Sequence, residues 1–258
     1  MSGGHPILST RDLSCSFGAL RAVDGVSLDI ERGTMTGLIG PNGAGKTTFF
    51  NLLAGALKPT GGSVHFDGQD VTGMSPDRLF HLGLTRTFQI PRPFCRLSVL
   101  ENLLLTPPRQ SGETITGAVF RRGRMRAEER KMREKAMGIL DFMTLADLAD
   151  HPAGKISGGQ TKLLELARAL MGDPALILLD EPAAGVNPSL TNILIDRIEA
   201  LNRQGLTFFI IEHDMDFVMR HCAPVIALAE GRVVFHGSAE EAQADEGLLD
   251  AYLGTGVA

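Results

Sequence analysis

The chain has 258 residues, 43 % of them hydrophobic, and a formal net charge of −5 at pH 7. This content supports a substantial core in one large or two small domains, and the acidic balance excludes generic nucleic-acid binding. No apolar run approaches the ~20 residues that span a bilayer, and the first six residues lack the pattern of a signal peptide. We therefore expect a soluble protein whose membrane role, if it has one, depends on a partner.

The cysteines predict a reducing compartment. Cys15, Cys95 and Cys222 are far apart, odd in number and without metal-type spacing. We expect three reduced thiols in a cytosolic protein. Thirty glycines suit an α/β protein with many tight connections between strands and helices.

Residues 7–30 predict an antiparallel pair of strands, because apolar positions alternate on both sides of a turn at Gly18. Phe17 ends the first of them. Its ring could stack on a purine or fill the apolar face of the strand, and the pattern alone favours the core.

Residues 40–48 form the most informative stretch, because they match the pattern G-x-x-x-x-G-K-[ST] between an apolar strand (35–39) and a helical segment (48–57). Glycines let backbone N–H groups turn inward around phosphates, and the start of a helix attracts an anion. Lys46 adds a positive charge for the outer phosphates, and Thr47 offers a hydroxyl to Mg²⁺. An accidental glycine-rich turn is the alternative, and the strand and helix on either side favour a phosphate-binding loop. The loop residues are Gly40, Pro41, Asn42, Gly43, Ala44, Gly45, Lys46, Thr47 and Thr48.

Residues 59–89 predict a turn, a strand (63–66), a short helix after Ser75 that ends at Gly83, and a strand that ends at Gln89. A glutamine at the end of a strand is usually only solvated, so Gln89 alone carries little weight.

The middle of the chain predicts helices, with a loop at 107–123 and a charged helix at 125–142. Seven basic residues lie in 121–133. They could form a patch for nucleic acid or anionic lipid, but mixed charge at helical spacing favours a solvated face. Ser157 then precedes two glycines and a helix (161–171). A helix cap and a second anion site explain this motif equally well, and the phosphate loop favours the anion site.

Two buried strands end in polar residues that can perform chemistry. The strand at 175–179 leads into Asp180 and Glu181, and the strand at 206–211 leads into His213. In open α/β sheets these strand ends bind ligands. Asp180 can hold Mg²⁺, Glu181 can orient or deprotonate a water, and His213 can contact a γ-phosphate. The alternative is a polar strand end with a structural histidine. Two more strands (225–228 and 233–236) and a helix capped by Ser238 complete the chain.

Taken together, these motifs resemble the ATP-binding-cassette (ABC) ATPase family over essentially the whole chain. Residues 40–47 resemble the Walker A motif, Gln89 the Q-loop, 156–160 the signature motif, 176–180 the Walker B strand, Glu181 the catalytic glutamate and His213 the switch histidine. The resemblance implies an α/β fold: a P-loop NTPase core with an antiparallel β subdomain and an inserted α-helical subdomain. We expect one domain at 7–254, with a core lobe (7–89 and 159–237), a helical subdomain (90–158) and a C-terminal helical tail (238–254).

The resemblance also implies ATP and Mg²⁺ as cofactors, with ATP held between two such domains. The implied catalytic residues are Glu181, His213 and Gln89, and the implied metal-binding residues are Thr47, Gln89 and Asp180. The implied nucleotide-binding residues are the loop 40–48, Phe17 as an adenine-stacking ring, and Ser157, Gly158, Gly159 and Gln160. Implied partners are two transmembrane permease subunits, a second ABC ATPase and an extracytoplasmic substrate-binding protein, with no nucleic acid. The implied location is the cytoplasmic face of the plasma membrane.

Within the family the chain looks most like the ATPases of importers for branched-chain amino acids, urea, amides and aromatic acids, by residues 180–188, 211–215 and 251–254. Asn187 replaces the usual aspartate of the D-loop, and two glycines follow Ser157 where this branch often has another residue before a single glycine. A lipid or lipopolysaccharide transport ATPase shares nearly every motif. A soluble ABC ATPase acting on ribosomes or DNA is a further alternative, but such proteins usually carry two cassettes or a coiled-coil insertion.

Overall fold

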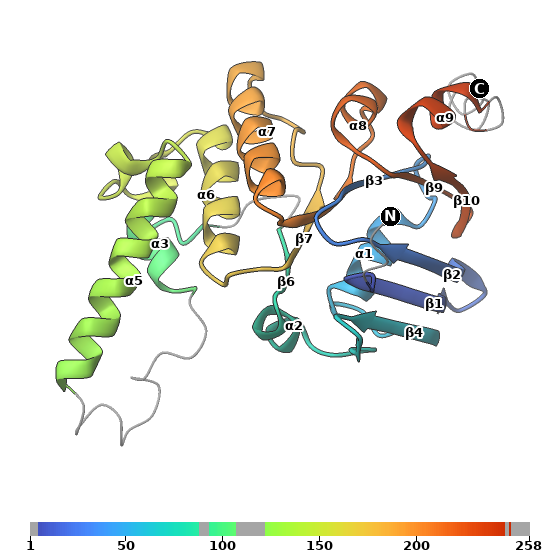
Figure 1. Cartoon of the computed structure of the whole chain (residues 1–258), viewed down its shortest axis with the longest axis horizontal. Helices are drawn as coiled ribbons and strands as arrows, with labels where there is room; N and C mark the ends of the chain where they lie inside the picture. Colours follow the sequence, from blue (N-terminus) through green and yellow to red (C-terminus); the bar gives the residue numbers. More distant parts are fainter. Residues whose placement is uncertain (1–4, 88–92, 107–121, 246–247, 249–258) are drawn as a thin grey trace. The chain divides into compact units, whose positions relative to one another are not determined.

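The computed structural model describes residues 5–87, 93–106, 122–245 and 248, with side chains in the long helix described from residue 127 (Figure 1). The chain divides into two compact units. The first unit consists of residues 1–89, 175–182 and 199–258, and the second of residues 90–174 and 183–198.

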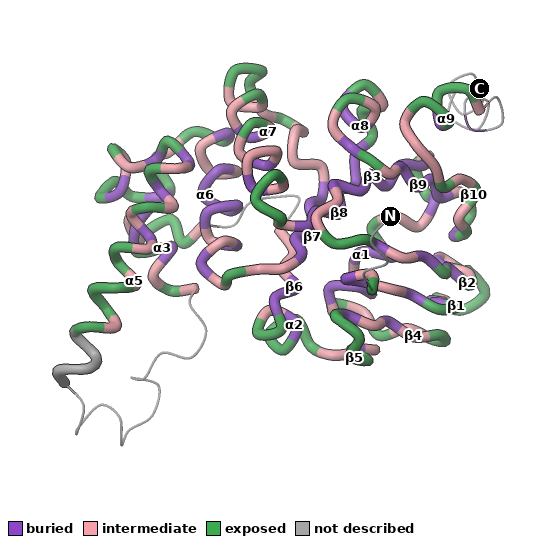
Figure 2. Tube along the Cα trace, in the orientation of Figure 1, coloured by how far each residue is buried: buried purple, intermediate pink, exposed green. Residues whose placement is uncertain are grey.

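A six-stranded sheet forms the centre of the first unit, in the order β10-β9-β3-β8-β7-β6. Its strands are β3 (Met35–Ile39), β6 (Leu84–Arg86), β7 (Leu176–Asp180), β8 (Thr207–Ile211), β9 (Val225–Ala229) and β10 (Arg232–Gly237). All neighbours pair in parallel except β10, which is antiparallel to β9. Every residue of β3, β7 and β8 is buried (Figure 2), as their continuous apolar runs predict.

A second, antiparallel sheet lies in the same unit, in the order β2-β1-β4-β5. Its strands are β1 (Leu8–Phe17), β2 (Leu20–Ile30), β4 (Gly61–Phe66) and β5 (Gln69–Asp70). The antiparallel pairing of β1 with β2 confirms the prediction for residues 7–30.

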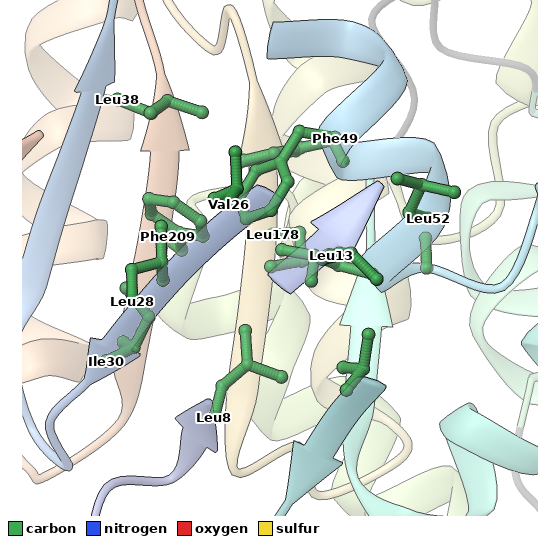
Figure 3. Packing of buried hydrophobic residues seen from close by; sticks show 14 of the residues in the cluster. Leu8, Leu13, Val26, Leu28, Ile30, Leu38, Phe49, Leu52, Leu178 and Phe209 are labelled. Atoms are coloured by element: carbon green, nitrogen blue, oxygen red, sulfur yellow. The ribbon is translucent and has the colours of Figure 1, made fainter. Parts of the chain in front are cut away.

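Helix α1 (Lys46–Leu53) contributes to the core that the two sheets share (Figure 3). Phe49 and Phe50 of α1 meet Phe209 of β8, with ring centroids 6.3 and 5.0 Å apart. Leu13 of β1 and Leu178 of β7 belong to the same buried cluster. This packing fixes the start of α1 next to the strand ends, where the candidate site lies. The other helices of the unit are α2 (Pro76–Leu82), α8 (Met215–His221) and α9 (Ala239–Ala244).

The second unit is helical. It contains α3 (Val99–Leu104), α5 (Arg122–Phe142), α6 (Gly158–Leu170) and most of α7 (Pro188–Arg203). The expected boundary at residue 159 differs from this division, because α6 packs on α3 and α5 and belongs with them. In α5, residues 127–135 are all exposed or half-buried, which agrees with the solvated face that the mixed charge predicts. Among the described residues, no helix is long and apolar enough to cross a membrane.

All three cysteines are free thiols, as expected. Cys15 and Cys222 are buried, whereas Cys95 is exposed. Burial raises the pKa of the Cys222 thiol to about 12.

Candidate functional site

The predicted phosphate loop connects β3 to α1, and its backbone requires glycine at two positions. Gly40 and Gly45 have φ angles of 152° and 97°. A Cβ atom on Gly40 would lie 2.2 Å from the carbonyl oxygen of Leu228, and one on Gly45 would lie 2.2 Å from that of Ala22. Gly45 is also the N-cap of α1 and has no side chain with which to cap it. The first N–H groups of α1 are therefore available to an anion.

Lys46 folds back over this loop. Its Nζ atom donates hydrogen bonds to the carbonyl oxygens of Gly40 at 2.5 Å and Pro41 at 3.0 Å. Burial lowers the pKa of Lys46, and the nearby carboxylates of Glu181 and Asp180 counteract part of this effect. The ammonium group thus lies among the carbonyls and carboxylates of the site, where it can exchange its carbonyl partners for phosphate oxygens.

Asp180 and Glu181 lie at the end of β7, as predicted. The side chain of Asp180 is buried, with 3 % of its surface exposed, and that of Glu181 is 26 % exposed. Glu181 has a φ of 49°, and its N–H group donates to the carbonyl of Ile211 on β8. A left-handed conformation is unfavourable for a residue other than glycine and is often retained at functional sites.

His213 follows β8 and lies beside the same strand end. Its Nδ1 atom is 3.7 Å from Oε1 of Glu181 and 3.8 Å from Oε2 of the buried Glu212, while 64 % of the His213 side chain is exposed. The structure therefore brings Lys46, Asp180, Glu181 and His213 together at one edge of the sheet.

Sequence reasoning missed Arg86, at the end of β6. One of its terminal nitrogens, Nη2, donates to Oδ2 of Asp180 at 2.7 Å, and the other, Nη1, donates to Oδ1 of Asn51 on α1. The guanidinium also lies over the ring of Phe50, 6.0 Å from its centroid. A signal was present, because an arginine in a strand of a buried parallel sheet requires an anionic partner.

Phe17 is 52 % exposed, so the interpretation of its ring as part of the core is wrong. It pairs across the hairpin with Leu20, which is 66 % exposed. An exposed ring remains available for stacking on a base. Gln89 lies outside the described residues.

In the second unit, Ser157 caps α6. Its Oγ atom accepts a hydrogen bond from the N–H group of Gln160 at 3.3 Å, and Oε1 of Gln160 accepts from the N–H group of Ser157 at 2.8 Å. This reciprocal pair is a capping box, so the structural interpretation of Ser157 is confirmed. It is compatible with an anion site, because Ser157 and Gly158 are exposed.

Gly159, in contrast, is buried against the next segment of the second unit. A Cβ atom there would lie 2.5 Å from Cδ1 of Leu190 and 3.0 Å from Cγ1 of Val186. Nζ of Lys162 also donates to the carbonyl of Ala184 at 2.6 Å. Asn187, where the family usually has aspartate, accepts through Oδ1 from the N–H group of Ser189 at the start of α7.

Comparison with known proteins identifies the family. The family profile described as "ABC transporter" matches residues 23–184. The chain belongs to the ABC transporter family. A probable branched-chain amino acid transport ATP-binding protein LivG from Archaeoglobus fulgidus is 42 % identical, over 96 % of this chain and 95 % of that protein. The high-affinity branched-chain amino acid transport ATP-binding protein BraF from Pseudomonas aeruginosa is 37 % identical, over 97 % and 98 %.

Solved structures agree with this assignment. An ABC transporter cassette crystallised in its ADP conformation is 36 % identical and superposes with a TM-score of 0.82, over 97 % of this chain and 100 % of that one. The predicted ABC ATPase fold is therefore confirmed. As a cassette of the ABC transporter family, the chain binds ATP, and its activity is ATP hydrolysis.

Proposed function

We propose that this chain is the ATP-hydrolysing subunit of an importer for branched-chain amino acids or a related small amide or organic acid. The observation that carries the proposal is that one edge of the sheet brings together four side chains, those of Lys46, Asp180, Glu181 and His213. The relatives that match nearly the full length of the chain are named for branched-chain amino acid transport. The convergence supports hydrolysis, and the relatives' names support the cargo.

In this proposal, the loop 40–48 binds the phosphates of ATP. The N–H groups at the start of α1 and the ammonium of Lys46 neutralise phosphate oxygens, and Lys46 releases the carbonyls of Gly40 and Pro41 as it does so. Phe17 offers its exposed ring to the adenine.

Mg²⁺ fits the donor set of this site. Thr47 and Asp180 supply a hydroxyl and a carboxylate, which are the oxygen ligands that Mg²⁺ prefers. Among the described residues, no group of three or more His, Cys, Asp or Glu side chains could form an all-protein metal cage. We propose that the cation is held partly by substrate phosphates, where it would neutralise charge as the γ-phosphate leaves. We assign Gln89 to the same metal by resemblance to the family.

Glu181 has the catalytic role in this proposal. Its carboxylate accepts a hydrogen bond from the attacking water and takes up the proton as the new bond to phosphorus forms. His213, 3.7 Å from that carboxylate, stabilises charge on the γ-phosphate and orients Glu181. The exposed Ser157 and Gly158, with Gly159 and Gln160, bind the nucleotide of a second ATPase, so that two copies or two paralogues enclose two ATP molecules.

Transport requires partners, because the relatives are named as the ATP-binding proteins of amino acid transport. We assign the chain to the cytoplasmic face of the membrane, held there by two permease subunits that receive cargo from an extracytoplasmic binding protein.

The decisive experiment reconstitutes the chain with its permeases in vesicles that contain ATP and measures uptake of radiolabelled leucine with and without the binding protein. We expect leucine uptake that depends on ATP. We also expect Glu181→Gln to bind ATP, to accumulate as a closed dimer and to lose roughly 10²- to 10⁴-fold in hydrolysis. Near-normal hydrolysis in that variant would remove Glu181 from its role. Hydrolysis without uptake of leucine or related compounds would overturn the cargo assignment alone.

A further inference from the structure

We propose that Arg86 is a positioning residue that reserves Asp180 for a cation arriving together with nucleotide. The guanidinium acts as the counter-charge of Asp180 until the phosphates of ATP bring enough negative charge for a divalent cation to bind. This inference rests on the proposed function, because it assumes that Asp180 serves the metal of MgATP.

The geometry fixes Arg86 from three sides within the first unit. Nη2 bonds to Asp180 on β7, Nη1 bonds to Asn51 on α1, and the face of the guanidinium covers the ring of Phe50. The Arg86 side chain is 16 % exposed. Such a planar fork, held by two acceptors and an aromatic face, is pre-organised, which a lysine at this position could not reproduce.

Burial gives this pair its importance. Burying an ionised carboxylate such as that of Asp180 costs free energy unless a cation pairs with it. The guanidinium of Arg86 is that cation when no metal ion is bound. The same cation repels a divalent ion that approaches Asp180. Arg86 therefore stabilises the carboxylate of Asp180 and opposes the binding of a metal ion without nucleotide.

The charges around the loop also oppose the binding of a metal ion without nucleotide. The two cations Lys46 and Arg86 balance the two carboxylates Asp180 and Glu181, and both carboxylates act on Lys46. These four side chains together carry no net charge, and the further carboxylate at this edge, that of Glu212, is buried beside His213. The phosphates of ATP supply negative charge, so metal and nucleotide should bind as a unit.

The test uses Mn²⁺ as the probe, because it accepts oxygen ligands and its free form gives an electron paramagnetic resonance signal that is lost on binding. Titrations without nucleotide compare the full-length wild type with Arg86→Gln and Arg86→Met. Glutamine keeps a hydrogen-bond donor for Asp180 and so protects the fold if methionine does not. We expect weak binding in the wild type and about tenfold or more tighter binding in the neutral variants, since a repulsive charge has been removed. Asp180→Asn added to Arg86→Gln should abolish the gain.

Two controls separate charge from structure. Arg86→Lys keeps the charge and should bind Mn²⁺ as weakly as the wild type. Arg11→Met removes an ion pair of the same 2.7 Å length, to Asp29 on the exposed side of the antiparallel sheet, and should change nothing.

The outcomes distinguish this inference from the proposed function. Tight Mn²⁺ binding by the nucleotide-free wild type, or unchanged binding in Arg86→Gln, would overturn the role of Arg86. If the wild type fails to bind Mn²⁺ even with a non-hydrolysable ATP analogue, the proposed metal site itself is wrong. Conditional binding in the wild type, relaxed in Arg86→Gln, supports both.

Discussion

Replacing each of the two glycines after Ser157 by alanine should change the free energy of unfolding in opposite directions. Gly158→Ala adds a Cβ atom that meets nothing within 4 Å beyond its chain neighbours and the backbone of its own helix, whereas Gly159→Ala adds one 2.5 Å from Cδ1 and 2.9 Å from Cβ of Leu190. The Cδ1 atom can rotate away, but the Cβ atom is fixed to the backbone of α7. Only the second substitution therefore forces the packing between α6 and α7 to open.

The magnitudes follow from two opposing contributions. Alanine is favoured over glycine in a helix by up to about 1 kcal/mol, and this gain applies to both positions. Overpacking typically costs about 1–3 kcal/mol, and we place Gly159 at about 2–3 kcal/mol because two atoms of Leu190 would lie within 3.0 Å of the added Cβ atom. We therefore expect Gly158→Ala to be neutral or stabilising by up to about 1 kcal/mol, and Gly159→Ala to lower the free energy of unfolding by about 1–2 kcal/mol. The gain is common to both variants, so they differ by the overpacking cost of about 2–3 kcal/mol, which for a chain of this size corresponds to roughly 4–12 °C in Tm.

Differential scanning calorimetry of both variants and the wild type measures this directly. Each variant serves as the matched control of the other, because the change in composition is identical and the positions are adjacent. The reasoning would be refuted if Gly158→Ala lost as much stability as Gly159→Ala. It would also be refuted if Gly159→Ala were fully stable, since the contact with Leu190 would then carry no cost.

Three further predictions concern single side chains. Lys46→Ala should weaken ATP affinity by about 10- to 100-fold, the value of a charged hydrogen-bonding group; unchanged affinity by equilibrium dialysis would contradict the role of the loop. Phe17→Ala should weaken ATP binding by about fivefold or more through lost stacking, with Tm unchanged because the ring is 52 % exposed; a large drop in Tm without loss of affinity would return the ring to a structural role. Since burial raises the pKa of Cys222 to about 12, this thiol stays protonated at pH 8, and mass spectrometry should find iodoacetamide on the exposed Cys95 and not on Cys222 in the folded protein.

Much of the fold could be predicted because its signals are local. Strands β3, β7 and β8 are continuous apolar runs, and the phosphate loop lies in one stretch between a strand and a helix. The caps at Ser157 and Ser238 likewise depend on residues three positions away. Asp180, Glu181 and His213 could be placed together because parallel strands end at the same edge.

The failures have a physical reason as well. Phe17 has the same parity as the buried Leu13 and Cys15, but it is the last residue of β1, beyond a register shift between Cys15 and Ser16. The alternation of apolar residues along a strand does not show at which residue the strand stops being covered by the rest of the core. Arg86 joins Asn51 and Asp180, which are 35 and 94 residues away in the sequence. Such a contact depends on the order of strands in the sheet, which periodicity does not encode.

The capping box at Ser157 determines which donors of α6 remain for a ligand. The N–H group of Gln160 is satisfied by the serine hydroxyl oxygen, and that of Thr161 by the serine carbonyl. For the N–H groups of Gly158 and Gly159 the described residues supply no acceptor. The Ser157 hydroxyl, which accepts from Gln160, still has its own proton to donate. An oxyanion that reaches this helix would therefore meet three donors, two from glycine backbone and one from a side chain whose rotamer the helix itself has already selected.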